Sequence, residues 1–195
     1  MTQPTTLHPV VLAVPAAERR LKGRPKVQAL RRNAREALAL SAGYSELPLG
    51  PLEKDENGAP LPSNGIYWSL THKSEFVAAV CSPHPVGIDI ERLRPVSRGL
   101  EERIATPDEW GMAPAVDQLL FFRFWTAKEA VLKAVGKGLT GLSSCHVRQI
   151  VDDDHMLLSY ESREWTVAHH RIEQDHLVTI TSDRVRLAWH VVGNS

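Results

Sequence analysis

The stretch VGIDIE, residues 86–91, is the part of the sequence that decides the fold. Its valine and isoleucines are β-branched and alternate with other residues, which predicts a strand. Because strand side chains alternate between faces, Asp89 and Glu91 share one face, two residues apart. Two carboxylates placed so close repel each other unless protons or a cation neutralise them.

This acidic pair has two interpretations. Mg²⁺ prefers oxygen ligands and is usually held by one or two carboxylates together with substrate phosphates, so the pair is a candidate magnesium site. The alternative is a solvated strand face whose charges point to water, and the stretch taken alone favours it. The apolar setting and Gly87 favour the metal site, because a glycine in a strand permits close approach of another backbone or a ligand.

The stretch FFRFWTAKEAVLKAVGKGL, residues 121–139, belongs to the segment with the clearest helical pattern. We predict this helix over residues 118–135, ended by Gly136 and Gly138, since glycine suits a left-handed cap. Apolar residues recur at spacings of three and four, which predicts a stripe that faces a core. The stripe comprises Leu120, Phe124, Ala127, Val131 and Ala134.

A second stripe on the same helix begins aromatic and ends charged. Phe122 and Trp125 are followed at helical spacing by Glu129 and Lys133. Because aromatic side chains are not typical of a solvent face, we expect the helix to be covered on both sides. The two charged residues are then either a routine surface pair, contributing roughly 0.2–0.5 kcal/mol, or a partly buried acid–base couple at a cleft.

Two further features carry chemistry in other contexts. His72 follows an apolar strand in YWSLTHKSEFVAAV, residues 67–80, and opens a turn one hairpin away from the acidic pair. A lone histidine in a turn is more often structural or solvated than catalytic. Basic residues gather between 19 and 35, where they could bind phosphates, form a solvated helix face or, less favourably, bind nucleic acid.

Composition narrows the class of protein. The chain has 195 residues, 43% of them hydrophobic and 24% charged, which is typical of one globular domain or two small lobes. A net charge of zero predicts neither a nucleic-acid nor a membrane partner. The two cysteines, Cys81 and Cys145, have no metal-like spacing and are interpreted as reduced core thiols. We expect no signal peptide, because residues 1–20 lack a basic start, and no membrane span.

The remaining segments alternate between strand and helix signals. We predict a helix over 27–40, with Val27, Leu30, Ala34, Ala37 and Ser41 on its apolar face, and a loop over 45–65. Strands are predicted at 10–14, 66–72, 75–82 and 86–91, a partly helical stretch at 92–115 and a meander of strands over 145–193. The stretches 74–91 and 174–192 both pair two strands around a polar turn, as two similar lobes or two ordinary hairpins would.

Four motifs occur in a fixed order along the chain. They are NGAP at 57–60, SLTHKSEFVAAV at 69–80, GIDIE at 87–91 and FWTAKEAVLKAVGKGL at 124–139. Together they resemble the 4′-phosphopantetheinyl transferases of the two-lobed, Sfp-type class. The combination of G-I-D-I-E with W-x-x-K-E-x-x-x-K-x-x-G-K-G-L is highly specific, and the resemblance covers roughly residues 20 to 150.

The resemblance implies an α+β fold of two pseudo-symmetric lobes, each a small, mostly antiparallel sheet packed on a helix, with the active site in the cleft between them. Residues 1–85 would form the lobe that binds the coenzyme A nucleotide, and residues 86–195 the lobe with the metal and catalytic residues. The implied reaction is Mg²⁺-dependent transfer of 4′-phosphopantetheine from coenzyme A to a serine of an acyl or peptidyl carrier protein, with release of 3′,5′-ADP. We expect a cytoplasmic monomer.

The resemblance also implies roles for individual residues. Asp89, Glu91 and Glu129 would bind the metal, and Glu129 and Lys133 would act in catalysis. Glu129 is the expected base for the serine, directly or through a water. The residues expected to bind coenzyme A are Arg24, Lys26, Arg31, Gly58, Pro60, Thr71, His72 and Lys133.

The chain departs from the family pattern at three points. Ala59 stands where the family often has a phosphate-binding lysine, for which Lys73 or Lys54 are candidate substitutes. Thr71 replaces the commoner serine. The segment 103–110 is short, which affects the expected carrier docking and leaves Glu109 as only a possible metal contact. Two alternatives follow: a catalytically weak paralogue that binds coenzyme A or a carrier protein without efficient turnover, or another Mg²⁺-dependent phosphoryl enzyme that acts on nucleotides.

Overall fold

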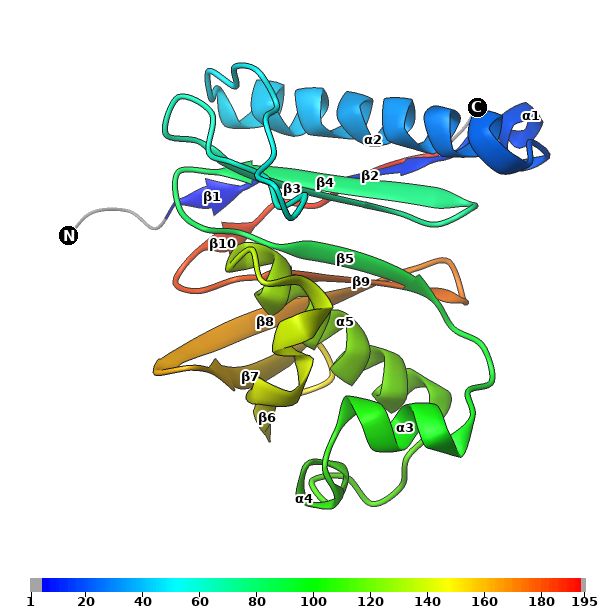
Figure 1. The fold of residues 1–195 in the computed structure, drawn as a ribbon, viewed down its shortest axis with the longest axis vertical. Coiled ribbons are helices and arrows are strands. Elements are labelled where there is room, and N and C mark those ends of the chain that lie inside the picture. Colours follow the sequence, from blue (N-terminus) through cyan, green and yellow to red (C-terminus); the bar gives the residue numbers. More distant parts are fainter. Residues whose placement is uncertain (1–4, 194–195) are drawn as a thin grey trace.

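The structure, a computed structural model, describes residues 5–193, so the first four residues of the N-terminal segment discussed above lie outside the described residues. The fold is α+β and consists of two lobes, each a sheet packed on a helix, which confirms the expected fold class. Figure 1 shows the resulting layers: helix α2, a first sheet, a second sheet, and helix α5 with its neighbours.

The elements that precede residue 86 build most of the first lobe. They are β1 (Thr6–Leu7), β2 (Val10–Ala13), α1 (Ala16–Arg19), α2 (Gly23–Ser45), β3 (Tyr67–His72) and β4 (Phe76–Ser82). The elements that follow are β5 (Ile88–Arg92), α3 (Arg98–Ile104), α4 (Pro107–Trp110), α5 (Gln118–Ala134), the 3₁₀ helix η1 (Gly138–Ser144), β6 (Cys145–Ile150), β7 (His155–Tyr160), β8 (Arg163–Ile172), β9 (His176–Thr181), β10 (Arg186–Leu187) and β11 (His190–Val192).

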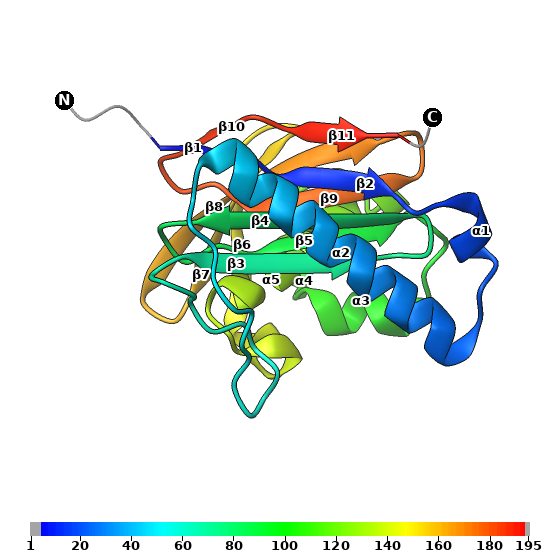
Figure 2. The same cartoon turned by 90° about the horizontal axis from the view of Figure 1, so that it is seen from above.

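The two sheets are linked by the end of the chain. The first sheet has the order β11-β2-β4-β3 and the second the order β5-β9-β8-β7-β6. Strand β11 pairs in parallel with β2, and β10 pairs in parallel with β1, so the last strands return to the first lobe. Figure 2 shows this return, with β11 beside β2. The division of the chain at residue 85 stays a prediction.

Apolar side chains fill three layers of core. One cluster lies between α2 and the first sheet, and another lies between α5 and the second sheet. The third joins the two sheets and includes Val11, Val80, Ile88 and Ile180. Because Ile88 and Ile90 of β5 face this third cluster, the intervening Asp89 points to the opposite face, toward α5.

Helix α2 is longer than the helix predicted over 27–40. It begins at Gly23. Pro25 is tolerated in the first turn, because the N–H that proline lacks would have no helical partner there. The helix continues through Gly43 and ends where Glu46 adopts a left-handed conformation with φ 53°. The predicted apolar face was wrong at Val27, which is 43% exposed; Leu30 and the residues after it on this face are buried.

Helix α5 agrees closely with its prediction. It spans Gln118–Ala134 and is followed by Gly136 and Gly138, both with positive φ, which confirms the predicted stop. Phe122 is only 2% exposed and Trp125 is half-buried, so the expectation that both sides of this helix are covered is confirmed.

Gly87 brings strand β5 into direct contact with helix α5. A Cβ atom placed on Gly87 would lie 1.9 Å from the Ala130 carbonyl oxygen and 2.8 Å from the Ala134 amide nitrogen. The predicted close approach is therefore confirmed, and the partner is a helix backbone. This contact sets the acidic face of β5 against the turn of α5 that carries Glu129 and Lys133.

Two expectations from composition have structural counterparts. Cys81 and Cys145 both lie in the core with free thiols, and burial raises the pKa of Cys145 to about 12. Within residues 5–193, none of the helices combines the length and the apolar character that crossing a bilayer requires.

Candidate active site

Asp89 is the most enclosed member of the acidic face. Its side chain is 8% exposed, and its Oδ1 atom accepts hydrogen bonds from Thr71 Oγ1 at 3.0 Å and Lys133 Nζ at 2.7 Å. Lys133 Nζ also donates to the Ile88 carbonyl oxygen at 3.1 Å, so two bonds hold the ammonium group. The other carboxylate oxygen, Oδ2, is buried and has no partner, although a buried polar atom is costly unless it is hydrogen-bonded.

Glu91 lies on the same strand face and has partners from both lobes. Its Oε1 atom is 2.7 Å from Lys73 Nζ, which comes from the turn between β3 and β4. The same oxygen accepts a hydrogen bond from Trp125 Nε1 of α5 at 3.1 Å. The aromatic residue of the second helix stripe therefore serves as a hydrogen-bond donor to the acidic face.

Glu129 completes the acidic cluster. Burial is the largest cause that raises its pKa, followed by the negative charge of Asp89, with a further contribution from Glu91. The positive charges of Lys133 and Lys73 oppose this rise. The helix thus brings a third carboxylate into electrostatic reach of the two on β5.

His72, at the end of strand β3, lies within electrostatic reach of Lys133 and Lys73. Burial lowers the pKa of His72, and the positive charges of Lys133, Lys73 and Arg31 lower it further, against a backbone hydrogen bond that raises it. His72 is therefore mostly neutral near pH 7. Of the predicted basic segment, Arg31 has a charge that reaches this histidine.

The other two residues of that segment that are predicted to bind coenzyme A, Arg24 and Lys26, lie nearer the start of α2. Arg24 and Arg31 are seven residues apart and so share a helix face, whereas Lys26 lies on another side of the first turns. Within the described part of the chain, no hydrogen bond or ion pair joins Arg24 or Lys26 to the acidic cluster. Their role in binding a phosphate remains a prediction.

A pocket of about 230 Å³ opens beside Lys133, between the loop before β3 and the end of α5. The predicted residues Gly58 and Pro60 line it, together with Ala59. Lys54 pairs with Pro60 in a short bridge and also lines the pocket. The lining contains Lys54, Asn57, Gly58, Ala59, Pro60, Trp68, Ser69, Leu70, Leu132, Lys133, Gly136, Lys137 and Gly138, with three lysines and no carboxylate among them. Its charge suits an anion.

Glu109 has different surroundings. Its Oε1 atom is 2.7 Å from Lys128 Nζ, and it accepts hydrogen bonds from the backbone amides of Thr106 and Val147. Burial raises its pKa, but these partners together hold the pKa below its usual value. These surroundings give Glu109 a structural role and do not support the possible metal contact.

The acidic cluster contains the type of ligand that a hard divalent cation prefers. Three carboxylates supply oxygen ligands, and the buried Asp89 Oδ2 atom has a free acceptor site. Among the described residues, no group of three or more His, Cys, Asp or Glu is arranged to hold a metal ion. Instead, Lys73 and Lys133 each pair with one oxygen of the cluster.

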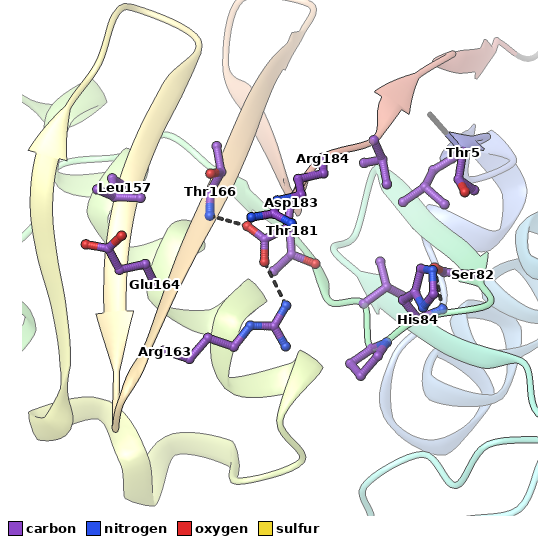
Figure 3. A pocket seen from close by; sticks show the side chains of 14 residues that line it. Thr5, Ser82, His84, Leu157, Arg163, Glu164, Thr166, Thr181, Asp183 and Arg184 are labelled. Carbon is purple, nitrogen blue, oxygen red and sulfur yellow. Dashed lines mark hydrogen bonds and ion pairs between the residues drawn. The ribbon is translucent and has the colours of Figure 1, made fainter. Parts of the chain in front are cut away.

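A second pocket, of about 510 Å³, lies at the other end of the lobe junction. Strand β4 begins beside the acidic cluster and ends at this pocket, which Ser82 and His84 line from the first lobe. Figure 3 shows Arg163 directed toward Asp183, with which it forms an ion pair at 2.8 Å. None of the predicted site residues lines this pocket, and its main charges pair with each other.

Sequence reasoning missed two contacts of the site. Lys73 was considered as a substitute for a phosphate-binding lysine, but its ion pair with Glu91 was not foreseen. Trp125 was assigned to the covered side of α5 without its indole donor. The sequence does contain a signal for the ion pair of Lys73 with Glu91. Lys73 follows His72 directly, in a turn one hairpin away from the acidic strand.

Comparisons with known proteins show which family this region of the chain resembles. A family model described as the 4′-phosphopantetheinyl transferase superfamily matches residues 85–181, which include the acidic strand and all of α5. The 4′-phosphopantetheinyl transferase gsp of Aneurinibacillus migulanus is 37% identical over 90 residues, which is 44% of this chain and 38% of that protein. The 4′-phosphopantetheinyl transferase psf-1 of Bacillus pumilus is 37% identical over 105 residues, 49% of this chain and 44% of that protein.

A further relative is the 4′-phosphopantetheinyl transferase Sfp of Bacillus subtilis (strain 168). It is 30% identical over 78 residues, 38% of this chain and 35% of that protein. In each of these three comparisons, the chain spans less than half the length of the curated relative that it matches.

Proposed function

The chain belongs to the 4′-phosphopantetheinyl transferase superfamily, in its Sfp-type class, and on this premise we propose that it transfers the 4′-phosphopantetheine arm of coenzyme A to a serine of an acyl or peptidyl carrier protein, with release of 3′,5′-ADP. The observation that carries the proposal is the meeting of Asp89, Glu91 and Glu129 with Lys133 where strand β5 contacts helix α5.

Asp89, Glu91 and Glu129 are the residues proposed to hold Mg²⁺. The buried, unpartnered Asp89 Oδ2 atom supports this assignment, because a cation would satisfy it. When bound, Mg²⁺ would neutralise pyrophosphate charge and so stabilise charge that develops during transfer.

Glu129 is proposed to accept the proton of the carrier serine. A general base works best when its pKa lies near the operating pH. Burial and the neighbouring charge of Asp89 move the pKa of Glu129 upward, in that direction. Its position on a long, well-packed helix keeps the carboxylate in place, since the adjacent residues of α5 are anchored in the core.

Lys133 and His72 are proposed to contact the phosphates of coenzyme A in different ways. The Lys133 ammonium group supplies positive charge next to the acidic cluster. His72, with its lowered pKa, would donate a hydrogen bond as a neutral ring at pH 7. Thr71 supports the site from the same strand by donating to Asp89 Oδ1.

The remaining coenzyme A contacts are assigned to the lysine-lined pocket and the start of α2. Gly58 and Pro60 would line the nucleotide pocket, where Lys54 and Lys137 supply charge that Ala59 cannot. Arg24, Lys26 and Arg31 are proposed to bind the nucleotide 3′-phosphate, and the electrostatic link between Arg31 and His72 supports Arg31 in particular. We further propose that the protein acts as a monomer in the cytoplasm.

Mass spectrometry of an apo carrier protein tests the proposal. The carrier is incubated with this protein, coenzyme A and Mg²⁺, and its mass should increase by one phosphopantetheine group at a serine. Omission of Mg²⁺ or addition of a chelator should abolish the increase. Binding of coenzyme A or carrier without any mass increase would instead indicate the weak paralogue considered for this sequence.

A further inference from the structure

Lys73 bridges the two lobes at the rim of the acidic cluster. It lies in the turn between β3 and β4, where its backbone amide donates to the Phe76 carbonyl oxygen at 2.8 Å. Its side chain leaves the first sheet and reaches Glu91 on β5, in the second sheet, at 2.7 Å. The backbone of Lys73 is thus fixed by the hairpin while its ammonium group is held by one carboxylate.

The two lysines of the cluster are held to different degrees. Lys133 has two recorded partners, the Asp89 carboxylate and the Ile88 carbonyl oxygen, and its side chain is 26% exposed. Lys73 has Glu91 as its recorded side-chain partner, and it is 36% exposed against 12% for Glu91. Lys73 can therefore turn into solvent with little loss of contacts of its own, whereas the mostly buried Glu91 would keep only the indole donor of Trp125 and would need another positive charge in its place.

Charge balance explains why Glu91 has this partner. The three carboxylates carry three negative charges, and Lys73 and Lys133 return two positive ones. A divalent cation placed on the carboxylates would leave one negative charge, so one of the two ammonium groups would become surplus, and the cation would repel both. Lys73, the less anchored of the two, would be displaced first and would then lie free beside the site.

We propose that Lys73 is an exchangeable counter-ion: it neutralises Glu91 while no divalent cation is bound, and on cation binding it turns to a phosphate of the substrate. This inference rests on the proposed function, because it takes the divalent cation and coenzyme A from it. It also assigns to this chain a substitute for the lysine that the family often has at the position of Ala59, since Lys73 directly follows the strand that carries Thr71 and His72.

Two binding measurements with opposite expected signs test the exchange. Free Mn²⁺ is followed by electron paramagnetic resonance during titration of the full chain, without substrate. Lys73→Met should bind Mn²⁺ about two- to fivefold more tightly than wild type, because no ammonium competes for Glu91. With Mn²⁺ saturating, calorimetry should show that the same variant binds coenzyme A about tenfold more weakly, because a charge-assisted contact is lost.

Lys54→Met is the matched control for the first measurement. It removes one positive charge from the same side of the molecule, and Lys54 has no recorded contact with the acidic cluster. Its Mn²⁺ affinity should equal that of wild type.

The outcomes separate the two proposals. Equal or weaker Mn²⁺ binding by Lys73→Met, beside a wild type that binds, would overturn the exchange and leave the proposed function standing. An equal gain in Lys54→Met would also overturn it, because the effect would then be general electrostatics. A wild type that binds no Mn²⁺ would overturn the metal site and the exchange together.

Discussion

Helix α5 takes part in two acid–lysine clusters on different sides of its axis, and they differ in how completely their atoms are satisfied. On one side, Lys128 and Glu109 pair at 2.7 Å with side chains only 2% and 5% exposed. Lys128 also donates to the Ile104 carbonyl oxygen, and Glu109 accepts from two backbone amides. On the other side, Glu129 lies among carboxylates, and Asp89 keeps a buried oxygen without a partner.

The difference distinguishes a structural ion pair from a site prepared for a ligand. In the first cluster, one lysine meets one carboxylate and hydrogen bonds occupy both carboxylate oxygens, with His146 Nδ1 a further 3.9 Å from Glu109 Oε2. In the second, three acids meet two bases, one of which is held by a single contact. Lys128 and Glu129 are adjacent in sequence, so the fold, through the two sides of one helix, decides which acid is structural and which is available.

The largest expected effect comes from Glu129→Gln, which removes a charge from the available cluster. Transfer to a carrier protein should fall about a thousandfold, within the range of a lost general base. The melting temperature should stay the same or rise, because burial and nearby carboxylates disfavour the charge on Glu129. Turnover and thermal unfolding are measured on the same sample. Near wild-type turnover at saturating Mg²⁺ would remove Glu129 from the site.

Breaking the structural cluster should produce the reverse pattern. Lys128→Met leaves the Glu109 carboxylate buried without its base, which should lower the free energy of unfolding by about 4 kcal/mol. Turnover per folded molecule should remain close to that of wild type. Denaturant unfolding and an assay below the transition give the two values.

The double variant Lys128→Met with Glu109→Gln controls for this effect. It removes both charges and should recover part of the lost stability, because a neutral amide costs less to bury than a carboxylate. If the single variant were as stable as wild type, or had lost turnover while folded, the contrast between the two sides of α5 would be wrong.

Gly87→Ala tests how the available cluster is assembled. The added methyl group would meet the Ala130 carbonyl oxygen, a backbone atom of α5 that cannot turn aside, so we expect a loss of about 3 kcal/mol in unfolding free energy. Because β5 and α5 must separate, Lys133 should also lose its contact with Asp89, and turnover should fall in the folded protein. If Gly87→Ala were as stable as wild type, β5 and α5 would lie further apart than they do in the structure.

The smallest expected effect concerns a third buried polar group under α5. His169 donates or accepts at Thr179 Oγ1, 2.7 Å away, and burial lowers its pKa to about 3. The unfolded chain takes up this proton near pH 6.5, so stability is full above that pH and falls between about 6.5 and 3. At pH 5 the loss from this group is about 2 kcal/mol.

Urea unfolding at pH 7.5 and pH 5.0 measures that loss. His169→Phe should show a drop smaller by about 2 kcal/mol than wild type, because it has no proton to gain. An identical drop in both proteins would mean that the imidazole is protonated in the folded state. Such a result would weaken the idea that buried groups beneath α5 stay neutral unless they are paired.

Much of the fold could be predicted from local patterns. The alternation in VGIDIE and the stripes of α5 predicted the strand and the helix, whereas the grouping of Asp89 with Lys133 was implied only by the family resemblance. The predicted start of α2 at residue 27 was wrong, since the helix begins at Gly23. Val27 was taken as the first residue of the apolar face, but it is exposed, because an apolar residue is not always buried.

The rest depended on contacts between distant segments. The parallel pairing of β11 with β2 joins residues 190–192 to 10–12, and no local signal specifies such a partner. The partners of Glu91 come from a turn of one sheet and a helix beside the other. Glu109 could be separated from the candidate metal ligands only when its pairing with Lys128 was seen.

The location of a bound divalent cation tests the central claim most directly. Crystals grown with Mn²⁺ and coenzyme A should give one dominant anomalous peak, bounded by Asp89, Glu91 and Glu129, with Lys73 no longer on Glu91. A dominant peak elsewhere, or no peak among these carboxylates with Lys73 still paired to Glu91, would contradict the assignment of the acidic cluster as the site of transfer.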